Sequence, residues 1–173
     1  NVFATPLFQH PLELGADVVV YSATKHIDGQ GRVLGGAILG AKDYIRNGVE
    51  PLLRHTGPSM SPFNAWVLVK GLETMQLCVN AQAQSSLRIA QWLEGRPTVA
   101  SVRYPYLESH PQHALALRQM SGGGTVVTVT LDGGKAEAFA VLNRLRLVDI
   151  SNNLGDAKSL STHPATTTHR RFS

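Results

Sequence analysis

A lysine with two hydroxyl side chains beside it is the group in this sequence best suited to chemistry. Lys25 follows an apolar run at residues 16–20, and Ser22 and Thr24 precede it closely. An amine that is desolvated at the end of a buried strand loses its proton readily and can form a Schiff base with a carbonyl group. Two hydroxyls spaced two residues apart in extended chain project to one side, where they could bind two oxygens of a phosphate. The group therefore predicts a site for an aldehyde cofactor that carries a phosphate.

Lys25 also has an ordinary alternative role, as a solvated lysine just past the end of a strand. Most lysines are exposed, and Ser22 and Thr24 could make local turn hydrogen bonds instead of binding a ligand. Open α/β sheets, however, bind ligands beyond the carboxyl ends of their strands, which is where Lys25 would lie. Spacing alone leaves both interpretations open.

The elements that would position Lys25 alternate between strands and helices. Residues 18–21 are a continuous apolar run, which is typical of a strand covered on both faces in a parallel sheet. We then expect, in chain order, a strand at 34–39, a helix at 42–54, a long helix at 63–94, a strand at 99–104, a helix at 112–120, a strand at 125–131, a helix at 135–146 and a strand at 147–150. This pattern predicts an α/β first half and an α+β second half.

The long helix is expected to connect two domains. Ser61 and Pro62 are typical of an N-cap and a first helical position, Gly71 could bend the helix, and Gly95 followed by Pro97 stops it. A helix of this length would extend about 45–50 Å. We therefore predict part of a large domain at residues 1–83 and a smaller, incomplete C-terminal domain at residues 84–173.

Composition restricts the class of partner. The chain has 16 Lys and Arg against 12 Asp and Glu, but the basic residues are scattered and indicate neither a nucleic-acid partner nor a membrane partner. No apolar run reaches membrane-spanning length, and the first residues lack the pattern of a signal peptide. Cys78 is the only cysteine, which fits a reducing cytoplasm. We expect a cytoplasmic protein, and interpret the chain as a fragment because it begins without methionine.

Three further patterns give weak signals. Gly29, Gly31 and Gly35 resemble a dinucleotide-binding loop, but position 34 is leucine and a strand follows, so both spacing and context fail. Residues 121–124 are expected to be a turn. His110 and His113 have the spacing of a ligand pair without a third ligand, and no metal site is predicted.

Several segments resemble one known family over nearly the whole chain. They are Asn-Val-Phe-Ala-Thr-Pro at 1–6, Ser-Ala-Thr-Lys at 22–25, Val-Leu-Gly-Gly at 33–36, His-Thr-Gly at 55–57, Lys-Gly-Leu-Glu-Thr at 70–74, Asn-Leu-Gly-Asp at 153–156 with Ser-Leu at 159–160, and His-Pro-Ala-Thr-Thr-Thr-His at 163–169. In this order the segments resemble the Cys/Met-metabolism family of pyridoxal-phosphate enzymes.

The resemblance implies a fold-type I architecture, with a large, mostly parallel-sheet domain that binds the cofactor, followed by a smaller α+β domain. It implies a homo-oligomer, a dimer of dimers, with sites at dimer interfaces. Lys25 would carry pyridoxal 5'-phosphate as a Schiff base, and Ser22 and Thr24 would hold the cofactor phosphate. Asn153 would face the amino-acid substrate, at a position where the lyases and cystathionine synthases of the family usually have serine.

The implied reaction is a γ-replacement on an activated homoserine ester, in which succinate leaves and sulfide adds to give homocysteine. Residues 25–32 and 150–155 are most similar to family members that use sulfide. A γ-synthase, a γ-lyase and a non-catalytic relative remain alternatives. The resemblance places the aspartate that pairs with the pyridine nitrogen, the arginine that binds the substrate carboxylate and a stacking tyrosine outside this sequence. The 173-residue chain alone is therefore expected to be inactive.

Overall fold

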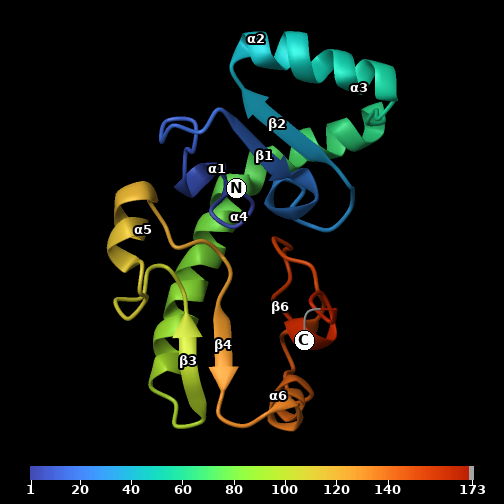
Figure 1. Cartoon of the computed structure of the whole chain (residues 1–173). Helices are drawn as coiled ribbons and strands as arrows, with labels where there is room; N and C mark the ends of the chain where they lie inside the picture. Colours follow the sequence, from blue (N-terminus) through green and yellow to red (C-terminus); the bar gives the residue numbers. More distant parts are fainter. Residues whose placement is uncertain (172–173) are drawn as a thin grey trace.

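The computed structural model describes residues 1–171, and a long helix joins its two halves (Figure 1). The elements of the first half are α1 (Thr5–Phe8), β1 (Val18–Ser22), the π-helical turn η1 (Ala23–Ile27), β2 (Gly36–Gly40), α2 (Lys42–Tyr44), η2 (Ile45–Val49) and α3 (Glu50–Thr56). The long helix α4 (Pro62–Glu94) and the second half follow, with β3 (Val99–Arg103), α5 (His113–Gln119), β4 (Thr128–Leu131), α6 (Lys135–Leu142), β5 (Asp149–Ile150), β6 (Leu160–Ser161) and η3 (Pro164–Thr166).

The strand that precedes Lys25 pairs differently from the expectation. Strand β1 pairs with β2 in antiparallel fashion, with Val18 opposite Gly40 and Ser22 opposite Gly36. Val19 and Tyr21 are buried on one face, whereas Val20 on the other face is 59% exposed. The expectation of a parallel neighbour is therefore wrong for the pair of β1 and β2. An apolar run does not reveal strand direction. The connection at residues 23–35 contains only the turn η1 and no longer crossover helix, and the chain returns antiparallel.

Helix α4 is unbroken over its 33 residues, as expected from its start and stop signals. The Ser61 side chain accepts a hydrogen bond from the Asn64 backbone at 3.1 Å, which confirms the predicted N-cap. The helix passes behind the β1–β2 pair and continues along β3 (Figure 1). The domain boundary near Ala83 stays a prediction, and residues 172 and 173 of the predicted second domain lie outside the described residues.

The second half contains shorter strands than the sequence pattern predicts. Strands β3 and β4 pair antiparallel, and β4 begins at Thr128 rather than at residue 125. The predicted last strand is reduced to Asp149–Ile150, which pairs in parallel with the unpredicted β6. The alternating pattern extends to residue 125, but Gly124 has a φ of +82° and the chain there packs against the first half instead of continuing the sheet.

Two apolar clusters lie along α4. In the first half Ala23 and Val33 pack with Val67 and Leu68 of the helix. In the second half Ala90 packs with Tyr104 and Leu107. Other large apolar side chains of α4 are exposed in this chain, among them Phe63, Trp66, Leu77 and Trp92. Within residues 1–171, no helix combines the length and the apolar character needed to cross a membrane.

Candidate active site

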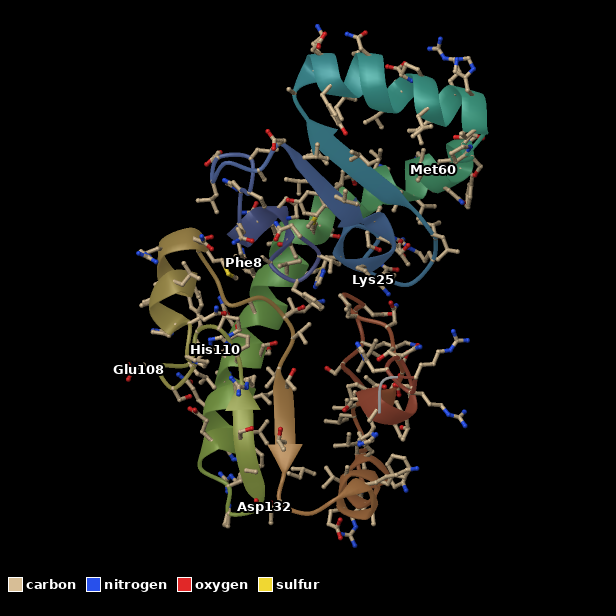
Figure 2. The ribbon with its side chains drawn as sticks, viewed as in Figure 1. Phe8, Lys25, Met60, Glu108, His110 and Asp132 are labelled. Atoms are coloured by element: carbon tan, nitrogen blue, oxygen red, sulfur yellow. The ribbon has the colours of Figure 1, made fainter. Side chains whose placement is uncertain are left out.

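The loop that carries Lys25 folds back on the end of β1. The backbone N–H of Ala23 donates to the Gly35 carbonyl at 2.8 Å, and the Gly35 N–H donates to the Thr24 hydroxyl oxygen at 3.0 Å. Lys25 follows with φ −90° and ψ −119°, outside the helical region, so the backbone is kinked at this residue. Lys25 therefore lies half-buried at the rim of the first half, facing the C-terminal segment (Figure 2).

The amine of Lys25 meets a residue that is 128 positions away in the sequence. Lys25 Nζ donates a hydrogen bond to Asn153 Oδ1 at 2.6 Å. Both side chains are partly buried, so the bond is shielded from bulk water on part of its surface. The structure thus brings together two of the residues that the sequence analysis assigned to a site.

Glycines allow the two loops of the site to touch through their backbones. Gly155 has a φ of +71°, and a Cβ atom at this position would lie 2.6 Å from His26 N and 2.9 Å from the Lys25 carbonyl carbon. A side chain at Gly155 would therefore push Asn153 away from Lys25. Only glycine combines this backbone conformation with so close a contact at low energetic cost.

Helix α4 packs against the Lys25 loop at Gly71. A Cβ atom at Gly71 would lie 2.1 Å from the carbonyl oxygen of Ile27 and 3.1 Å from that of Asp28. The sequence analysis allowed that Gly71 bends the helix, but the helix is unbroken. The absence of a side chain instead lets the backbone that follows Lys25 lie directly on the helix.

The far end of the Lys25 loop is closed by an ion pair between Asp28 and Arg32. Arg32 Nε donates to the Asp28 carboxylate at 2.9 Å, and the Asp28 side chain is fully buried. Burial acts to raise the pKa of Asp28, but the hydrogen bonds and charge of Arg32 outweigh burial and hold the pKa below its ordinary value. The carboxylate therefore stays ionised and fixes residues 28–32 as a closed turn.

His26, directly after Lys25, connects the loop to the second half. Its Nε2 lies 2.7 Å from Thr125 Oγ1, while its buried Nδ1 has no well-formed hydrogen bond within the described residues. Burial lowers the pKa of His26 to about 4, and a weaker polar contact with the Val2 backbone acts in the opposite direction. The imidazole is therefore neutral at physiological pH.

The buried His26 predicts that stability falls in mild acid. The unfolded chain takes up a proton as the pH drops below 6.5, whereas folded His26 stays neutral until about pH 4. The contribution is therefore complete above pH 6.5 and is lost between pH 6.5 and 4, and amounts to about 3 kcal/mol. Urea unfolding at pH 7, 6, 5 and 4 measures it.

The same titration of His26→Gln should show a weaker loss over this range, because glutamine carries no titrating group. His10→Gln, at a histidine with an exposed side chain, serves as the control and should keep the loss seen in the original protein. Equal slopes for the His26→Gln variant and the original protein would contradict the assignment to His26.

The two predicted phosphate ligands lie in different backbone environments. Ser22 ends β1, and its side chain does not cap the turn that follows, so the hydroxyl is available to a ligand. Thr24 lies inside the turn, where its hydroxyl oxygen already accepts the Gly35 N–H. The premise that both project to one side of an extended chain is therefore wrong, since the strand ends between them. Their role as phosphate ligands stays a prediction.

Sequence reasoning missed the contacts that assemble the site. Gly155 and Thr125 of the second half contact the Lys25 loop at His26, and Gly71 lets the same loop lie on α4. Single glycines inside a helix or a loop are the one available signal, because an interior glycine is costly without a packing reason. Within residues 1–171, no group of three or more His, Cys, Asp or Glu side chains is placed to hold a metal ion.

Comparison with known proteins defines the class of this site. A family model described as Cys/Met metabolism PLP-dependent enzyme matches residues 1–173, and the chain belongs to this family. It is 67% identical over 174 residues to the O-succinylhomoserine sulfhydrylase of Mycobacterium tuberculosis (strain CDC 1551 / Oshkosh), covering 98% of this chain and 43% of that protein. It is 50% identical over 173 residues to the O-succinylhomoserine sulfhydrylase of Pseudomonas aeruginosa, covering 100% of this chain and 43% of that protein.

Solved structures agree on the fold. The chain superposes on cystathionine gamma synthase from Xanthomonas oryzae pv. oryzae with a TM-score of 0.95 at 35% identity, covering 100% of this chain and 45% of that chain. It superposes on the methionine gamma lyase CalE6 of Micromonospora echinospora with a TM-score of 0.93 at 38% identity, covering 98% and 46%. The predicted fold-type I class is confirmed, and so is the similarity to O-succinylhomoserine sulfhydrylases. The chain spans less than half the length of these relatives.

The residues present fit pyridoxal phosphate. The half-buried primary amine of Lys25 suits the aldehyde, and its hydrogen bond to Asn153 holds the amine in position. The Ser22 hydroxyl lies three residues before Lys25 in the sequence and does not cap the turn between them, so its chemistry suits a phosphate oxygen. The family assignment and the donor set therefore agree on this cofactor.

Proposed function

We propose that the protein to which this chain belongs is a pyridoxal-phosphate-dependent sulfhydrylase of methionine biosynthesis. It would convert O-succinylhomoserine and sulfide to homocysteine and succinate. The observation that carries the proposal is the Lys25–Asn153 bond at 2.6 Å, in a chain 67% identical to a sulfhydrylase. Asparagine at this position is the feature that the sequence analysis used to separate sulfide-using members from lyases.

Lys25 would serve first as the covalent attachment point of the cofactor and then as a mobile acid and base. Bound at this site, the cofactor supplies an electron sink for charge that develops on the substrate. The freed Lys25 amine would take a proton from Cα and deliver one further along the substrate chain, which requires an amine held close to both carbons. The Cγ–O bond breaks with loss of succinate, and a Cγ–S bond forms with sulfide.

Asn153 can serve Lys25 and the substrate at once. Its Oδ1 accepts a hydrogen bond from the Lys25 amine. Both N–H groups of the amide then remain to donate to a substrate carboxylate. Ser22 and Thr24 would bind the cofactor phosphate from the end of β1. The Asp28–Arg32 pair and Gly71 would hold the backbone of the Lys25 loop in place while the Lys25 side chain moves between positions on the substrate.

The proposal predicts a single covalent attachment site. Borohydride reduction of the full-length protein with pyridoxal phosphate, followed by peptide mass mapping, should find the phosphopyridoxyl group on Lys25. Complete modification at another lysine would overturn the site, and a folded protein without any adduct would favour the non-catalytic relative.

Substrate panels separate the sulfhydrylase from its relatives. O-succinylhomoserine with sulfide should give homocysteine faster than the same ester with cysteine gives cystathionine, and methionine alone should give no sulfur product. The reverse order of rates would identify a cystathionine γ-synthase, and release of a thiol from methionine would identify a γ-lyase.

Assembly and location belong to the same proposal. We propose a cytoplasmic homotetramer, built as a dimer of dimers. The apolar side chains Trp66, Leu77 and Trp92 of α4 are exposed in this chain. They support an assembly in which other polypeptide covers this helix. Light scattering of the full-length protein after size-exclusion chromatography would give four chains per particle, and a monomer would contradict this part of the proposal.

A further inference from the structure

Gln82 is a polar residue of α4 that binds the loop opposite Lys25. Its Nε2 donates a hydrogen bond to the carbonyl oxygen of Asp156 at 3.0 Å. The other end of the same amide, Gln82 Oε1, is buried and has no hydrogen-bond partner within residues 1–171. Gln82 therefore holds the loop with one atom while it leaves a second polar atom unsatisfied.

Such an arrangement does not favour stability. A buried acceptor without a partner destabilises the folded state, whereas an apolar side chain of similar size would avoid that cost. A buried unsatisfied group calls for a reason other than stability. The position of the loop that Gln82 holds provides one, because the loop carries Asn153 three residues before Asp156.

Helix geometry relates Gln82 to the other contact that supports the site. Gly71 and Gln82 are eleven residues apart, close to three full turns, so both lie on the same face of α4. Gly71 contacts the backbone of Ile27 and Asp28, just after Lys25. Gln82 contacts Asp156, just after Asn153. One straight helix therefore sets the distance between the two loops of the site, with its two contact points about 16 Å apart along the axis.

We propose that Gln82 is a positioning residue for Asn153. By holding the Asp156 carbonyl, it keeps residues 153–156 against the Lys25 loop, so that Asn153 Oδ1 stays within hydrogen-bond distance of the amine. The inference deepens the proposed function and rests on it, because it assigns Gln82 a part in the action of Lys25 and Asn153. It assigns Gln82 no contact with the substrate.

Hydrogen exchange measured by mass spectrometry tests the position of the loop directly. In the full-length protein with pyridoxal phosphate bound, Gln82→Leu should speed exchange in a peptide covering residues 152–157 by about 2- to 12-fold, the range expected for one lost hydrogen bond. Gln84→Leu makes the same change at an exposed position of the same helix and should leave this peptide unchanged. The urea midpoint of Gln82→Leu should not fall, since the buried unpaired oxygen is also removed.

Turnover distinguishes a positioning role from a structural one. Gln82→Leu should lower kcat by a similar 2- to 12-fold in the original protein and by no further factor in an Asn153→Ala background, because residues that act through one another are not additive. Gln82→Met repeats both measurements with an unbranched side chain, so the proposal remains testable if the leucine variant does not fold.

Unchanged exchange in the 152–157 peptide, or equal kcat losses in both backgrounds, would overturn the assignment of Gln82. The proposed function fails separately, if the original protein turns over none of the substrates offered. In that case the exchange comparison alone still decides whether Gln82 holds the loop.

Discussion

Lys25→Ala is expected to abolish turnover by the full-length protein and to remove the borohydride-trapped adduct. Loss of proton transfer alone lowers rates on the order of 10²- to 10⁴-fold, and loss of the covalent attachment adds to this. Steady-state kinetics with O-succinylhomoserine and sulfide measure the effect. Folding should be little affected, because the partner of Lys25, Asn153, is only half-buried and can bind water.

Two further variants define the cause of this loss. Lys25→Arg keeps a positive charge and N–H donors for Asn153, but arginine neither gives up its proton at working pH nor attaches to an aldehyde in the same way. It should be as inactive as alanine. Lys42→Ala removes an exposed lysine of α2 and should be as active as the original protein. Turnover by Lys25→Arg within tenfold of the original would contradict both assigned roles.

Gly71→Ala is expected to have the largest effect on stability. The added methyl group would lie 2.1 Å from the Ile27 carbonyl oxygen, and both the helix and the loop offer only backbone at this contact. Neither can move by rotating a side chain, so the loop must separate from α4. Overpacking of this kind costs up to about 3 kcal/mol, and urea unfolding measures it.

Gly48→Ala is the matched control for Gly71→Ala. Gly48 also lies in a helical segment, η2, and nothing stands within 4 Å of a Cβ atom at that position. Helix propensity then predicts a gain of up to about 1 kcal/mol. The two variants should therefore change stability in opposite directions. A neutral Gly71→Ala would show that the loop does not rest on the helix.

Local signals predicted the parts of this fold that depend on local chemistry. The apolar run before Lys25 is a strand, and Ser61 and Gly95 bound α4 because capping and helix termination act over a few residues. Strand direction and the length of β4 could not be predicted in this way, since both depend on which distant segment supplies the hydrogen bonds.

The candidate site shows the same division. Lys25 became a candidate because of its own neighbours, although spacing alone left its role open, and Asn153 became a candidate through the family resemblance. The bond between them, and the roles of Gly71 and Gln82, depend on three segments meeting in space. A helical glycine or a buried glutamine looks ordinary in sequence, because its partner is a backbone carbonyl that any residue could provide.

The separation between Lys25 and Asn153 has a consequence for biosynthesis. A ribosome must add 128 further residues before Asn153 exists to bind the amine, and 99 before Thr125 can meet His26. Contacts of such long range form slowly and expose incomplete surfaces in the meantime. Throughout that interval the nascent chain presents a lysine without the partners that hold it in the folded protein. The hydrogen bond that holds the Lys25 amine in the folded protein is therefore unavailable until residue 153 has been synthesised.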